Sequence, residues 1–127
     1  MSVLMLALRR QVGEQPPDAI VKHVARGVGA APTEREADAM AVAAHLGFGA
    51  TIGAAYALLP RTGAPAVRGV VTALAVYAAS YQGWVPALGI LPPATRDHPG
   101  RPAVMIGAHV VYGAVLGAVE ERLRARR

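Results

Sequence analysis

The sequence predicts an all-α fold: a polytopic transmembrane helical bundle with three full spans, an N-terminal partial helix and a short amphipathic interfacial helix. The first reason is that residues 39–60, 69–95 and 102–119 contain no Asp, Glu, Lys or Arg. About 18 consecutive apolar residues are enough to cross a bilayer. The second is that only 17% of the chain is charged, against about 25% in ordinary soluble domains. The third is a helical motif that occurs in two of these runs.

Composition narrows the class of protein further. A chain of 127 residues makes one domain, and the absence of Cys excludes disulfides and thiolate metal sites. The net charge of +5 comes from arginines clustered at the ends of the apolar runs, which is typical of membrane helices rather than of nucleic-acid binding. A soluble Ala-rich bundle is the alternative, but residues 39–60 offer only His45, Thr51 and Tyr56 as a polar face.

Two short segments precede the first predicted span. Residues 1–10 form an apolar stretch that ends in two arginines, too short to cross the hydrocarbon and therefore expected to be the last turns of a partial first helix. Residues 18–29 are expected to form a basic amphipathic helix. Such a helix lies in the membrane interface or, alternatively, caps the ends of the bundle in water.

The first two spans are expected at residues 34–59 and 66–84. Thr33 and Glu36 have the spacing of a capping box, which begins a helix. A tight Pro- and Gly-containing connection then returns the chain, so the two helices are antiparallel. Three residues are expected to anchor the second span at the membrane surfaces: Arg68 at its start, by reaching to the headgroups, and Tyr81 and Trp84 near its end, as part of an aromatic belt.

Residues 85–102 are expected to form an interfacial loop, because Pro86 and later prolines interrupt the helix and the segment is too short to cross. Asp97 and His98 in this loop are expected to be solvated. The third span is expected at residues 103–119, followed by a tail in water. Four arginines in that tail favour a cytoplasmic C-terminus in a bacterial inner membrane, by the positive-inside rule.

The repeated motif is H-x-x-aromatic-G-A-x-x-G-A, and it begins at His45 and again at His109. Its glycine pairs have the small-xxx-small spacing that lets helices approach closely in lipid. We therefore expect a non-enzymatic structural or accessory subunit that packs in a homo-oligomer or a larger membrane complex. The residues expected to pack are the four glycines and the two aromatics of the motif: Gly49, Gly53, Gly113, Gly117, Phe48 and Tyr112.

The two histidines leave alternatives open. Each imidazole is expected to bond a carbonyl or hydroxyl group on a neighbouring helix, with Ser80, Thr72 and Tyr77 as candidates, and to serve only the structure. A second possibility is that His45 and His109 bind haem b between facing spans, and a third is that they handle protons. The charge-free runs contain no carboxylate or thiol, so no catalytic residues and no other metal site are expected.

The chain also resembles a known type of protein. The resemblance rests on four segments, residues 45–50, 80–84, 87–96 and 109–114. These look like small uncharacterised bacterial inner-membrane proteins that carry a domain of unknown function, similar to the YagU-like group. The resemblance covers about residues 1 to 119 and implies four spans, of which this chain has only the end of the first. It implies no activity, and at most a loose link to acid stress.

Overall fold

The computed structural model describes residues 16–97 and 100–126, and every regular element among them is helical. The predicted all-α class is confirmed, whereas the expected partial helix at residues 1–10 and His98 lie outside the described residues. Two helices, α3 and α6, are long and apolar enough to cross a membrane. The elements in order are α2 (Pro16–Gly27), α3 (Glu34–Leu58), α4 (Pro65–Tyr77), the π-helix η1 (Ala78–Trp84), α5 (Val85–Ala87), the 3₁₀ helix η2 (Ala94–Arg96) and α6 (Gly100–Arg124).

The capping box at the start of α3 is formed as the sequence suggests. The Glu36 amide donates to the Thr33 hydroxyl oxygen at 3.3 Å, and the Thr33 amide donates to the Glu36 carboxylate at 2.8 Å. Pro60 follows directly after the C-cap residue Leu59, where a proline prevents further helix.

Helix α4 passes into a π-helix where the sequence suggested a break. The helical path runs from Pro65 to Ala87 without interruption, and the Val85 amide donates to the Ser80 carbonyl, five residues back. Pro86 has no amide hydrogen, and its ring crowds the carbonyl four residues earlier. A wider turn ahead of this proline lets the helix continue one residue past it, to Ala87.

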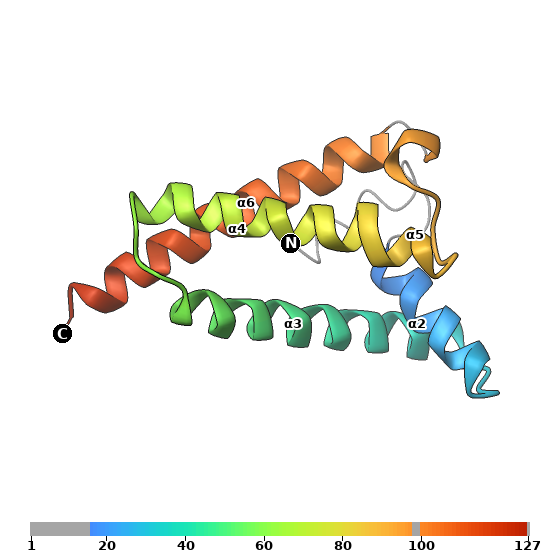
Figure 1. Cartoon of the computed structure of the whole chain (residues 1–127). Helices are drawn as coiled ribbons and strands as arrows, with labels where there is room; N and C mark the ends of the chain where they lie inside the picture. The colour runs from blue at the N-terminus through green and yellow to red at the C-terminus, as the bar shows by residue number, and fades with distance from the viewer. Residues whose placement is uncertain (1–15, 98–99, 127) are drawn as a thin grey trace.

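Helices α4 and α6 cross in close contact, as Figure 1 shows. The crossing is made of glycines: an added Cβ on Gly113 would lie 2.5 Å from the Gly69 carbonyl oxygen, and one on Gly117 would lie 2.3 Å from the Pro65 carbonyl oxygen. Real Cβ atoms do not approach that closely, so only glycine allows the two backbones to meet here. Ala73, 1% exposed, extends the same seam.

Helix α3 runs apart from this pair, below α4 and α6 in Figure 1. It packs mainly on α2, and the buried residues of those two helices are largely alanines, among them Ala25, Ala37 and Ala41. Two tyrosine hydroxyls join α3 to the other helices: Tyr56 donates to the Pro65 carbonyl at 3.1 Å, and Tyr112 donates to the Gly49 carbonyl at 2.7 Å. Helix α3 is therefore held at a distance, with space between it and the α4–α6 pair.

Large apolar side chains cover the outer surfaces of the helices. On α6, Val111 is 63% exposed, and on α3, Leu46 is 61% exposed. Further exposed apolar residues on the three long helical segments are Met40, Phe48, Leu58, Val67, Val71, Ile106, Val110, Val115 and Val119. Soluble monomers rarely expose so continuous an apolar surface.

Candidate functional site

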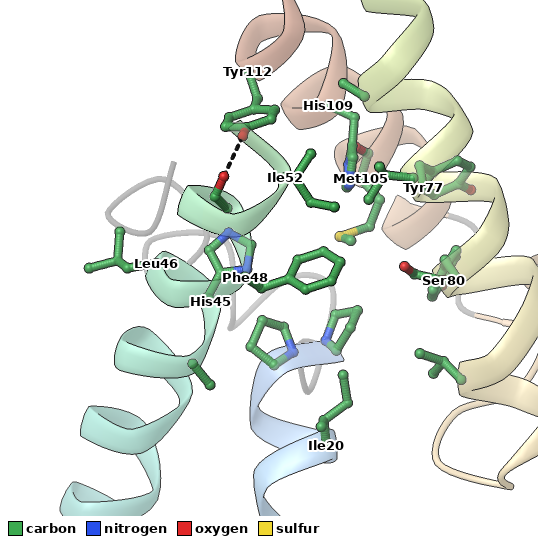
Figure 2. A pocket seen from close by; sticks show the side chains of 18 of the residues that line it. Ile20, His45, Leu46, Phe48, Ile52, Tyr77, Ser80, Met105, His109 and Tyr112 are labelled. Atoms are coloured by element: carbon green, nitrogen blue, oxygen red, sulfur yellow. Dashed lines mark hydrogen bonds between the residues drawn. The ribbon is translucent and has the colours of Figure 1, made fainter. Parts of the chain in front are cut away.

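A cavity of about 630 Å³ occupies the space between α3 and the α4–α6 pair, with the start of α2 at one side (Figure 2). Its volume lies within the roughly 300–1,000 Å³ of small-molecule sites. The walls are almost wholly apolar. The described residues that line it are Pro16, Pro17, Ile20, Ala44, His45, Leu46, Phe48, Gly49, Ala50, Ile52, Gly53, Ala73, Val76, Tyr77, Ser80, Tyr81, Trp84, Val85, Met105, His109, Tyr112 and Leu116.

Both motif histidines line this cavity, His45 from α3 and His109 from α6 (Figure 2). The Nδ1 atom of His109 lies 2.7 Å from the Met105 carbonyl oxygen, one turn earlier in its own helix. The Tyr77 ring packs edge-on against the His109 imidazole, with ring centroids 5.4 Å apart. The carbonyl partner of His109 therefore lies in its own helix and not on a neighbouring helix as expected, and the Nε2 atom of His109 is left for another partner.

The two glycine pairs of the repeat occupy different environments. Gly113 and Gly117 lie against the backbone of α4. Gly49 and Gly53 instead line the cavity, where an added Cβ would meet only side chains at 3.8 Å or more. The repeat therefore makes one close helix crossing within the chain and one wall of a cavity.

The aromatic residues of the repeat also differ in place. Phe48 extends from α3 into the cavity, while Tyr112 crosses from α6 to bond α3 (Figure 2). Tyr112 occupies the position in the repeat that Phe48 has on α3. Its hydroxyl, which phenylalanine lacks, is one of the two tyrosine hydroxyls that join α3 to the other helices.

The π-helix contributes Ser80, Tyr81 and Trp84 to the same cavity. Trp84 is 40% exposed, as a surface anchor would be. Tyr81 is only 2% exposed, and its hydroxyl donates to the Asp97 carboxylate, so it lies inside the protein rather than in the expected aromatic belt. π-Turns within helices are rare and are frequent at functional sites.

Asp97, which was expected to be solvated, forms a buried pair with Arg101. The exposed fractions of their side chains are 3% and 10%, and Arg101 donates to the Asp97 carboxylate. The expectation of a solvated Asp97 is therefore wrong: the aspartate accepts from both Tyr81 and Arg101, which satisfies a buried charge. The four-residue spacing of Asp97 and Arg101 is the only local signal in the sequence that could have indicated this pair.

A second charged cluster lies at the opposite end of α4 and α6. Arg68 donates a hydrogen bond to the Glu120 carboxylate. Arg124 donates to the same carboxylate at 3.0 Å, and the Nε atom of Arg61 lies 3.5 Å from it. The Arg68 guanidinium lies 4.5 Å from the centroid of the Tyr56 ring. Arg68 was expected to reach to lipid headgroups, but its side chain is only 11% exposed. It joins α4 to α6 instead.

The chemistry available in the cavity is limited. No Asp, Glu, Lys or Arg is among its described lining residues, and no group of three or more potential metal ligands occurs among residues 16–97 and 100–126. Two imidazoles and a few hydroxyl groups suit hydrogen bonding, or axial ligation of a haem iron. Comparison with protein-family models, curated proteins and solved structures gave no match.

Proposed function

We propose that the chain is an integral membrane protein with three spans that serves, without catalysis, as a structural or accessory subunit. The observation that carries this proposal is the apolar outer surface of α3, α4 and α6, which would be costly in water and is favourable in hydrocarbon. Helices α3 and α6 have the length and composition for two of the spans. The resemblance to the YagU-like group agrees with this proposal but adds no activity to it.

The third span in this proposal is the continuous helical path from Pro65 to Ala87. The whole path, from Pro65 to Ala87, is longer than the about 20 residues that a crossing requires. Its charge-free part begins after Arg68. The charged clusters lie at the two ends of this path, around Glu120 and around Asp97. They would then lie near the two membrane surfaces, with the C-terminus on the cytoplasmic side of a bacterial inner membrane.

The partner in this proposal is another membrane helix, from a second copy or from a larger complex. Gly113 and Gly117 are already covered by α4, so they are not free for this contact. The outward side of α3 carries exposed small residues that do not line the cavity, Ala43, Gly47 and Ala54. Their spacing of four and seven residues makes a smooth ridge, which favours close helix packing in lipid.

The subunit role is tested by the size of the protein in a mild detergent. The wild type should run larger than a monomer with its bound detergent, and Gly47→Leu should reduce that size because the added side chain holds the helices apart. Gly107→Leu is the matched control, since Gly107 is also exposed and has no neighbouring atoms within 4 Å. A monomeric wild type, or equal sizes for both variants, would contradict the proposal.

The second candidate function is a haem b-binding or proton-coupled membrane component. It is favoured by one observation, the presence of His45 and His109 in the walls of one cavity. The bond between His109 Nδ1 and the Met105 carbonyl resembles the outer-shell bond that orients metal-ligating histidines. Protein purified from membranes should then show a Soret band that His45→Ala or His109→Ala abolishes; a colourless preparation after haem supplementation rules the haem out.

A further inference from the structure

The cavity combines a large apolar wall with a few polar side chains on different sides of it. His45, Ser80 and His109 lie around its interior on three different helical segments (Figure 2). A mostly apolar pocket with a few convergent polar groups is the usual form of a small-molecule site. The π-helix that supplies Ser80 is a second, independent feature associated with functional sites.

The electrostatics of the cavity select a neutral ligand. The two charged clusters at the ends of α4 and α6 are internally paired, Arg101 with Asp97 and Arg68 with Glu120. None of them is among the described lining residues. A charged ligand would therefore lose its hydration without gaining a counterion, which is costly in an apolar site.

The hydrogen bonding of His109 selects a ligand that donates a hydrogen bond. In the neutral imidazole one ring nitrogen carries the hydrogen and the other accepts. The carbonyl of Met105 only accepts, so the hydrogen belongs on Nδ1 of His109 and Nε2 is an acceptor. A ligand hydroxyl group would satisfy Nε2, whereas a ketone, an ether or a plain hydrocarbon would not.

The cavity also communicates with the surroundings of the helices. Phe48 and Trp84 line it and are nevertheless 45% and 40% exposed. In the membrane arrangement proposed above, these surroundings are the acyl chains, so a ligand would enter from the bilayer.

We propose that this cavity binds a neutral, lipid-soluble molecule bearing a hydroxyl group, with the hydroxyl directed to His109 and the apolar body held between α3 and α4. The proposal rests on the membrane placement, because only a membrane protein would receive such a ligand laterally. It does not depend on the accessory-subunit role.

The experiment is a fluorescence titration of the purified full chain in mild detergent with 4-nonylphenol as the probe. Trp84 is the single tryptophan and lines the cavity, so excitation at wavelengths absorbed by tryptophan alone reports on the site. The expected result is a saturable change. The methyl ether of the same probe lacks the donor and should bind about 3- to 10-fold more weakly, as expected for one lost hydrogen bond.

Two glycine variants on α3 separate binding from partition into the detergent micelle. Gly49 lines the cavity and has space for a side chain, so Gly49→Leu should fill the cavity and abolish the saturable change. Gly47 does not line it, so Gly47→Leu should leave the titration unchanged even where it alters oligomer size. An undiminished response in Gly49→Leu would overturn the proposal.

The hydroxyl preference is tested separately with His109→Phe. This variant should bind the phenol and its methyl ether equally, because the acceptor is gone while an aromatic ring remains. If the wild type already binds both probes equally, or His109→Phe keeps the preference, the assignment is wrong. A Soret band from haem in this space would also overturn it. A monomeric protein that still binds the phenol would contradict only the subunit role.

Discussion

At the scale of single residues, Gly113 controls a close backbone contact between α4 and α6. Gly113→Ala places a Cβ about 2.5 Å from backbone atoms of Gly69 and Val70, and backbone cannot yield as a flexible side chain does. The α4–α6 crossing must then open, and we expect a loss of about 1–3 kcal/mol in the free energy of unfolding. Unfolding of the purified protein in mixed micelles measures this loss.

The matched control is Gly107→Ala on the same helix, where the new methyl group meets nothing within 4 Å. Alanine also favours helix over glycine by up to about 1 kcal/mol, so this variant should be at least as stable as the wild type. Equal losses for the two variants would show that the crossing is not as close as the structure describes.

Glu120 is a second residue with a specific role, since it accepts Arg68 from α4. Glu120→Gln should lower the melting temperature because it leaves the largely buried guanidinium of Arg68 without its counter-charge. Glu121→Gln, one position along on the exposed side of the helix, should leave the melting temperature unchanged. Thermal unfolding of both variants in detergent is the measurement.

The same pair predicts a pH dependence. The hydrogen bond from Arg68 holds the pKa of Glu120, which follows the charge-free stretch of α6, below its ordinary value. A lowered folded-state pKa contributes stability that is present above the unfolded-state pKa and is lost as pH falls through the folded-state pKa. The difference in melting temperature between the wild type and Glu120→Gln should therefore shrink in acid; a difference that grows there contradicts the pairing.

At the scale of elements, the outer side of α6 is expected to face lipid. Val111→Arg, at a 63% exposed position near the middle of the charge-free stretch, should reduce membrane insertion by about 2.5–3.5 kcal/mol. Leu123→Arg, equally outward but beyond Glu120 and Glu121, should insert normally. Insertion of the two variants into microsomes, scored by glycosylation, gives the comparison, and normal insertion of Val111→Arg would contradict a lipid-facing α6.

The helices themselves were predictable because their signals are local. The capping box of Thr33 and Glu36, together with Pro60, set the limits of α3 close to where the structure has them. The π-helix could not be predicted, because Pro86 is compatible with a break as well as with a widened turn. The partner of Gly113 was also beyond the sequence: the repeat drew attention to Gly113, but its contact Gly69 lies in α4 outside any motif.

The candidate site was predictable in part. The repeat identified His45 and His109, and the structure places both on one cavity. The cavity itself depends on how far α3 stands from α4 and α6, which tyrosine bonds such as that from Tyr112 to Gly49 determine. The buried role of Asp97 was not predicted, because its partner Tyr81 is sixteen positions away along the chain.

At the scale of the whole molecule, the central claim is that three helical segments cross a bilayer. Figure 1 places the α3–α4 connection and the end of α6 at one end of the molecule, and α2 and α5 at the other. The absence of Cys from the sequence allows single introduced cysteines to be labelled from each side of the membrane. Four exposed positions suit this measurement: Ala31, Thr62, Thr95 and Ala125.

Labelling of these four single-cysteine variants with a membrane-impermeant maleimide, in intact spheroplasts and in inverted vesicles, is the most direct measurement. The account predicts that Thr62→Cys and Ala125→Cys react from one side only, and that Ala31→Cys and Thr95→Cys react only from the opposite side. Reaction of all four from the same side, or recovery of the chain in the fraction released without detergent, would contradict it.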